Sequence, residues 1–115
     1  MSLFGTLLLV LACPPDEPRS PLQSLAEMTV HPGCRVELIA SEPVISDPIS
    51  IAFGADGRLW VVEMRDYPLG ESDSGQGQIR ILEDRNRDGL FDQATVFLDQ
   101  LSYPNSVLPW KDGAI

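Results

Sequence analysis

The chain is 115 residues long and carries 17 acidic side chains against eight Lys and Arg, a formal net charge of −9 at pH 7. No run of basic residues could neutralise a phosphate backbone, so we expect no nucleic-acid partner. The length allows one domain of ordinary size. An acidic surface also offers oxygen ligands to hard cations such as calcium.

The N-terminal segment MSLFGTLLLVLAC, which ends at Cys13, contains no charged side chain. Its apolar run over residues 3–11 is too short to span a bilayer as a helix and is typical of an export signal, although a buried apolar segment is the other interpretation. Ala12 followed by Cys13 resembles a bacterial lipoprotein cleavage box, which would make Cys13 a lipidation site. A disulfide between Cys13 and Cys34 is the alternative. We therefore expect residues 1–13 to be a signal peptide, membrane contact to be limited to a lipid anchor, and the protein to be exported to the periplasm or cell envelope.

Residues 14–33 are predicted to be a linker before the folded domain of residues 34–115. The Pro-rich stretch PPDEPRSP at residues 14–21 cannot hold a helix or pair in a sheet, and it suits a tether. A short helix is expected over Gln23–Thr29.

From Arg35 onward, short apolar alternations separated by turns predict an all-β chain. Asp56-Gly57 supplies the tight turn of a hairpin. Four antiparallel strands between about residue 48 and residue 99 would form one blade of a β-propeller, so the predicted fold is a partial propeller of one four-stranded blade and the start of the next. The expected strands are residues 35–40, 48–53, 59–64, 78–83 and 95–98.

A self-match supports this prediction. Ser46–Leu59 (SDPISIAFGADGRL) aligns without a gap on Ser102–Ile115 (SYPNSVLPWKDGAI), with Ser, Pro, Ser, Asp and Gly identical. A constant offset of this size is typical of repeat architectures whose units bury their apolar faces against each other. We therefore expect the chain to be the N-terminal fragment of a larger array, with the remaining propeller blades as its partners.

One loop has the pattern of a calcium site. Residues 84–92 (DRNRDGLFD) fit the motif D-x-[DN]-x-D-G-x-x-D. Oxygen ligands at alternate positions of a turning loop converge on one point, and the Gly permits the sharp bend. The flanking segments are strand-like and Thr95 stands where a helical calcium hand has Glu, so the prediction is a calcium loop between strands, with a plain polar hairpin turn as the alternative. The predicted ligands are Asp84, Asn86, Asp88, the carbonyl of Leu90, and Asp92.

A second candidate site follows the apolar strand, in the sequence EMRDYP at residues 63–68. A loop after a rigid strand is a common place for function. Arg65 could hold an anionic cofactor or substrate, and Asp66 could orient it. The alternative is an internal ion pair between Arg65 and a carboxylate that pins the loop. No Ser/His/Asp set or phosphate loop can be assembled, so no catalytic residue is assigned.

The motifs DGRLWVVEMRDYP and LEDxNxDGxxD, within residues 22–115, resemble the start of the membrane-bound dehydrogenases abundant in planctomycetes and related bacteria. Those proteins are similar to the glucose and sorbosone dehydrogenases that use pyrroloquinoline quinone on a β-propeller. The resemblance implies an exported oxidoreductase that oxidises a sugar or polyol with this quinone. It also implies a catalytic His in a later blade, which nothing in this chain matches. The alternative is a non-catalytic extracytoplasmic propeller that binds carbohydrate or a protein partner.

Overall fold

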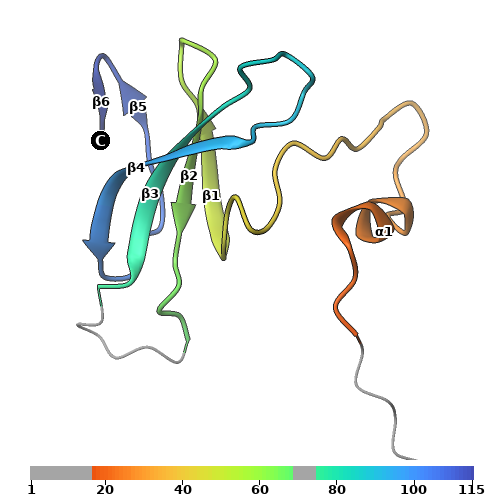
Figure 1. The fold of residues 1–115 in the computed structure, drawn as a ribbon, viewed down its shortest axis with the longest axis horizontal. Helices are drawn as coiled ribbons and strands as arrows, with labels where there is room; N and C mark the ends of the chain where they lie inside the picture. Colours follow the sequence, from red (N-terminus) through yellow and green to blue (C-terminus); the bar gives the residue numbers. More distant parts are fainter. Residues whose placement is uncertain (1–16, 69–74) are drawn as a thin grey trace, which may run out of the picture.

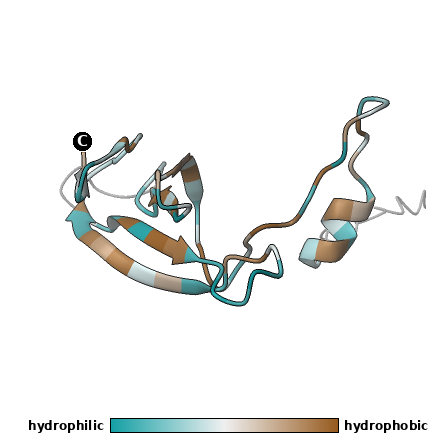
Figure 2. Cartoon of the chain, turned by 90° about the horizontal axis from the view of Figure 1, so that it is seen from above, coloured by the Kyte–Doolittle hydropathy of each residue, from teal (hydrophilic) through white to brown (hydrophobic). Residues whose placement is uncertain are grey.

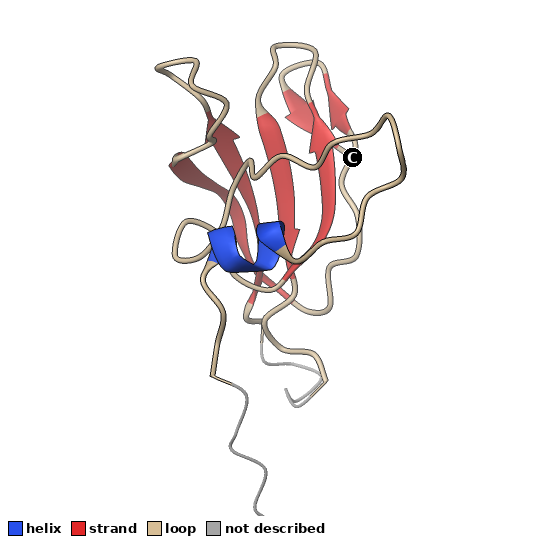
Figure 3. Cartoon of the chain, turned by 90° about the vertical axis from the view of Figure 1, so that its right-hand side faces the viewer, coloured by secondary structure: helices blue, strands red, loops and turns tan. Residues whose placement is uncertain are grey.

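The computed structural model describes residues 17–68 and 75–115 (Figure 1). Within them, β1 to β4 form a four-stranded antiparallel sheet in chain order, and β5 and β6 form a separate hairpin. The predicted all-β class is confirmed, because the regular elements of the described residues are strands apart from one short helix (Figure 3). The elements are α1 (Pro21–Ala26), β1 (Pro48–Phe53), β2 (Leu59–Glu63), β3 (Gly77–Glu83), β4 (Gln93–Leu101), β5 (Pro109–Trp110) and β6 (Gly113–Ala114).

The helix α1 begins two residues earlier and ends three residues earlier than the predicted Gln23–Thr29. Ser20 and Gln23 form a capping box, in which each side chain accepts a hydrogen bond from the backbone N–H of the other residue. Pro21 occupies the first helical position, where its missing N–H costs nothing. No residue of α1 is buried, and the helix stands apart from the sheet (Figure 1). No helix in residues 17–68 or 75–115 is long and apolar enough to cross a membrane.

The strand predicted over residues 35–40 does not form. Ile39 accepts a backbone hydrogen bond from Phe91 at 2.7 Å, and its segment runs over a face of the sheet instead of pairing with an edge. Only the end of the predicted strand therefore packs on the sheet, while Val36 is 43% exposed. The side chains that pack against this face are Ile39, Ala40, Val44 and Ile45.

The core lies on both faces of β2, whose five residues are all buried. Successive side chains of a strand point to opposite faces, so β2 contributes to two clusters. Leu59 and Val61 lie with Leu82 under the segment of residues 39–45. Trp60 and Val62 lie on the other face. Figure 2 shows hydrophobic residues along the strands and also along parts of the segment between α1 and β1. The second cluster is Trp60, Val62, Ile79, Ile81 and Val107.

Both copies of the sequence repeat contain a hairpin at the same place. In the first copy Phe53 pairs with Leu59, and the alignment of the two copies would pair Pro109 with Ile115. Pro109 pairs with Ala114 instead. The second turn is thus one residue shorter than the first. The repeat predicts the hairpin correctly, while the composition of each turn sets its register.

Candidate functional site

The antiparallel topology separates the two sites predicted from the sequence. The β1–β2 turn, the β3–β4 loop and the β5–β6 turn all lie at one end of the sheet, which we call the turn end (Figure 1). Residues 64–68, which follow β2, and the β4–β5 connection lie at the opposite end. The predicted calcium loop is therefore at the turn end, whereas Arg65 and Asp66 follow β2 at the opposite end. The structure does not bring the two sets of residues together.

The side chains of the predicted calcium loop hold the loop's own backbone. Asp84 accepts hydrogen bonds from the N–H groups of Asp88 and Gly89, at 3.1 and 2.9 Å. Asn86 accepts from the Asp88 N–H at 3.1 Å, and Asp88 accepts from the Leu90 N–H at 2.9 Å. Three oxygen-bearing side chains thus face the inside of a tight loop, as the motif predicts.

The fit of this loop to calcium is partial. Carboxylate and amide oxygens suit a hard cation, and an oxygen that accepts one hydrogen bond keeps a second lone pair. Asp92, the predicted closing ligand, instead accepts from the Gln93 side chain at 3.4 Å. In the described part of the chain, no group of three His, Cys, Asp or Glu side chains is arranged to hold a metal ion. Calcium binding stays a prediction.

A buried carboxylate organises the opposite end of the sheet. Glu63 is fully buried, and its Oε2 lies 2.6 Å from Arg65 Nη2 and accepts from Gln78 Nε2 at 2.5 Å. Its Oε1 accepts from the Ser46 N–H at 2.9 Å and lies 3.7 Å from Arg80 Nη1. This network joins β2, β3 and the segment before β1. Sequence reasoning had placed Glu63 in the motif without giving it this central role, although a carboxylate that ends a buried apolar strand was a signal.

Arg65 and Asp66 face different partners. Arg65 makes an internal ion pair with Glu63, which is the alternative interpretation of this motif, and its side chain is 36% exposed. Asp66 is 1% exposed and accepts from the Tyr103 N–H at 3.4 Å, which ties the β2–β3 connection to the β4–β5 connection. Of the two, only Arg65 presents a surface to solvent. A role for either residue in binding a cofactor or substrate stays a prediction.

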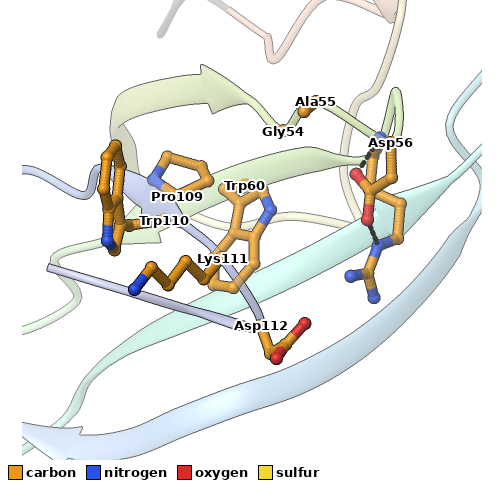
Figure 4. Close-up of a pocket in the computed structure, with 9 residues that line it drawn as sticks. Gly54, Ala55, Asp56, Trp60, Pro109, Trp110, Lys111 and Asp112 are labelled. Atoms are coloured by element: carbon orange, nitrogen blue, oxygen red, sulfur yellow. Dashed lines mark hydrogen bonds and ion pairs between the residues drawn. The ribbon is translucent and has the colours of Figure 1, made fainter.

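A cavity of about 370 Å³ lies at the turn end, between the two hairpins of the repeat (Figure 4). Its walls are residues 54–56 with Arg58 and Trp60 from the first hairpin, and residues 109–112 from the second. In the alignment of the two copies, Gly54 corresponds to Trp110 and Asp56 to Asp112. Equivalent turns of the two copies therefore face each other across the cavity. Sequence reasoning missed this site, although the alignment of the two turns was the signal that could have found it.

The wall contributed by the first turn carries a compact ion pair. Asp56 accepts from the Arg58 N–H at 3.1 Å and from Arg58 Nε at 2.5 Å. These two hydrogen bonds hold the pKa of the Asp56 carboxyl below its ordinary value of 3.8. The backbone bond has the larger effect and the side-chain bond the smaller one. Asp56 is therefore ionised across the physiological range. A second cavity, of about 480 Å³, shares Asp56 and Arg58 and borders the β3–β4 loop.

The predicted features of the N-terminus are only partly covered by the structure. Cys34 is exposed. Cys13 lies outside the described residues, and with it the predicted lipidation and the alternative disulfide. The predicted signal peptide and the first residues of the linker lie outside them as well.

Comparison with known proteins yields one family. A family model described as "Domain of unknown function (DUF7133)" matches residues 20–115, which include α1, the whole sheet and both hairpin turns. No curated protein and no solved structure matches the chain. The family match covers most of the sequence, so the chain belongs to the DUF7133 family.

Proposed function

We propose that this chain supplies one blade and the start of the next to an exported β-propeller related to quinone-dependent sugar dehydrogenases. One observation carries the architectural part of the proposal. The second copy of the repeat lies against a face of the first sheet, where Val107 and Ala114 pack on the cluster around Trp60 and Val62. Packing of one repeat unit on the face of the preceding unit is the arrangement of successive propeller blades.

The outer strands of the sheet support the same architecture. Six large apolar side chains of β1 and β4 are between 42% and 59% exposed. Covering such side chains contributes roughly 25 cal/mol for each Å² of apolar area removed from water. Further blades or strands of a propeller would cover this surface. The side chains are Ile49, Ile51 and Phe53 of β1 and Val96, Phe97 and Leu98 of β4.

The chemical part of the proposal rests on the resemblance of the sequence motifs. It assigns the full-length protein the oxidation of a sugar or polyol, with pyrroloquinoline quinone as the electron acceptor. The described residues do not form a site for this tricarboxylate by themselves, because Arg65 is already paired with Glu63 and Asp66 is buried. Arg65 is the residue here that could add a contact to the cofactor. The catalytic base would come from other blades, and calcium in the β3–β4 loop would stiffen the turn end.

The test uses the full-length protein with added quinone and calcium. Dye-linked oxidation of at least one compound in a broad panel of sugars and polyols is the expected result. A protein that binds the quinone yet oxidises no compound in the panel would contradict the dehydrogenase function. An Arg65→Ala variant should weaken quinone binding, whereas Arg19→Ala in the linker, matched for charge, should not.

The cavity between the hairpin turns favours a second candidate function, a non-catalytic propeller module that binds carbohydrate or a protein partner outside the cytoplasm. The cavity is formed within this chain and needs no quinone. Binding of a ligand to the full-length protein without any turnover would distinguish this candidate from the dehydrogenase.

A further inference from the structure

The cavity between the two hairpin turns combines a planar apolar wall with anionic and cationic side chains. Trp110 is 59% exposed and forms part of the wall (Figure 4). An exposed aromatic ring at a concave surface offers a flat apolar face to a ligand, and its burial on binding is favourable. The volume of about 370 Å³ lies within the range of small-molecule sites.

The charges around the cavity balance. Asp56 and Asp112 contribute two carboxylates, and Arg58 and Lys111 contribute two cations. An ionic ligand would find no net charge of the opposite sign, and the whole chain, at −9, disfavours anions. A neutral ligand with many hydroxyl groups can instead donate to the carboxylates and accept from the cations.

The indole N–H of Trp60 also faces this cavity. Trp60 is 3% exposed, yet it forms part of the lining. Its Nε1 would lie 3.2 Å from a Cβ built on Gly54, and the hydrogen bonds between described residues do not use this N–H. Because an indole N–H can only donate, a ligand oxygen in the cavity would satisfy it.

We infer that the cavity between the β1–β2 and β5–β6 turns is a binding site for a neutral saccharide unit. The sugar's apolar face lies on the Trp110 ring, and its hydroxyl groups reach Asp112 and the Trp60 N–H. The inference gives the binding-module candidate a location and a ligand class. It does not depend on the dehydrogenase, because neither Arg65 nor Asp66, the residues predicted to contact the cofactor, lines this cavity.

Gly54 keeps the cavity open. Its backbone is not in the left-handed region, so alanine is compatible with the chain path. A Cβ at this position would lie 2.6 Å from Asp56 Oδ1 and 3.2 Å from Trp60 Nε1. Gly54→Ala therefore narrows the site and forces the Asp56 side chain to move, without opening the core.

The test titrates the full 115-residue chain with neutral oligosaccharides, maltotriose and cellotriose, and follows the two indole N–H signals by NMR. Saturable shifts of both signals are expected with at least one sugar. Trp110→Ala should weaken binding roughly tenfold or more, as loss of a central aromatic anchor does. Tyr67→Ala removes an aromatic ring that is 70% exposed at the opposite end of the sheet, and it should leave the affinity unchanged.

Gly54→Ala should also weaken binding, with the far-ultraviolet circular dichroism of the folded chain unchanged. Neutral sugars that shift neither indole signal would overturn the inference. So would binding that survives both Trp110→Ala and Gly54→Ala, or binding that occurs only with a phosphorylated sugar such as glucose 6-phosphate. Because this readout is binding and not turnover, a full-length protein without dehydrogenase activity would contradict the proposed dehydrogenase and leave this result intact.

Discussion

Glu63 ends a strand whose five residues are all buried, and its two oxygens contact two guanidinium groups, an amide and a backbone N–H. Removing one partner of such a network leaves buried charges without a counter-charge. The resulting loss of stability is larger than the stability that the intact network adds relative to apolar side chains in its place. The partners come from three separate segments of the chain. Glu63 therefore fixes the position of the segment before β1 on the sheet as well as the course of the loop after β2.

Glu63→Ala should lower the free energy of unfolding by about 3 kcal/mol, because Arg65 and Arg80 lose their shared carboxylate. Urea denaturation followed by fluorescence measures this change. Glu27→Ala is the matched control, since the Arg19–Glu27 pair lies at the surface and should contribute less than about 1 kcal/mol. Equal effects of the two substitutions would show that the Glu63 network does not stabilise the fold.

Asp56 should titrate below its ordinary pKa of 3.8, chiefly because it accepts the Arg58 backbone N–H. A folded pKa below the ordinary one means that the stabilisation is present above that value and is lost as the pH falls through the folded pKa. Carboxyl NMR of the folded chain measures the midpoint. Arg58→Ala keeps the backbone N–H, so it should raise the pKa only part of the way, and a complete return to the ordinary value would contradict the assigned cause.

At the scale of elements, the β5–β6 hairpin acts as a cover for the sheet. Val107, in the segment leading into β5, is 8% exposed and packs with Trp60 in the same cluster, together with Val62 of β2. The hairpin itself is short, and two-stranded hairpins are marginal in isolation. The sheet and the hairpin therefore depend on each other for stability.

Val107→Ala should lower the free energy of unfolding by about 2 kcal/mol, since it removes buried methyl groups and leaves a small cavity beside Trp60. Thermal unfolding monitored by Trp fluorescence measures the loss. The neighbouring Leu108 is 57% exposed, so Leu108→Ala should change stability by no more than about 0.5 kcal/mol. A Val107→Ala variant as stable as the parent chain would mean that the segment leading into the hairpin does not stabilise the sheet.

The β3–β4 loop should take up calcium weakly, because Asp84, Asn86 and Asp88 already face the loop interior. Isothermal titration of the folded chain is the measurement. Asp88→Asn removes a charged ligand and should abolish the uptake, whereas Asp99→Asn, outside the loop, should preserve it. Absence of heat with the parent chain would leave the loop as a polar hairpin turn.

Among the described residues, large apolar side chains are exposed on both outer strands of the sheet. The apolar side chains of the outer strands β1 and β4 remain half exposed, while those of β2 are buried on both faces. Exposed apolar strands at the two edges of a sheet invite pairing with another chain. The centre of the sheet is thus buried on both faces, whereas its two edge strands present apolar side chains to further contacts.

The isolated chain should therefore self-associate as its concentration rises. Sedimentation velocity measures the association. Ile51→Thr combined with Val96→Thr should reduce it, because both side chains are exposed on the outer strands and threonine keeps the strand propensity. Leu22→Ala, at a similarly exposed apolar position in α1, should not change it. A chain that stays monomeric at all concentrations would show that these surfaces need no cover.

Several features of this protein were determined by its sequence alone. The limits of β1 match the prediction, and β2, β3 and the β1–β2 turn differ from it by a residue at most, because apolar alternation and Asp-Gly turn chemistry act over a few neighbouring residues. The hairpin of the second copy followed from the repeat for the same reason. The β3–β4 loop also adopts the tight turn that its motif indicates.

Only the tertiary structure decided which of these segments meet. Residues 35–40 have the alternation of a strand, yet they form no strand, and Ile39 and Ala40 at the end of this segment pack on a face of the sheet. Arg65 and Asp66 are neighbours in the sequence, but the carboxylate of Glu63 and the Tyr103 N–H draw them to different partners. The cavity between the hairpin turns arises because two turns far apart in the sequence face each other, a long-range arrangement that no local pattern encodes.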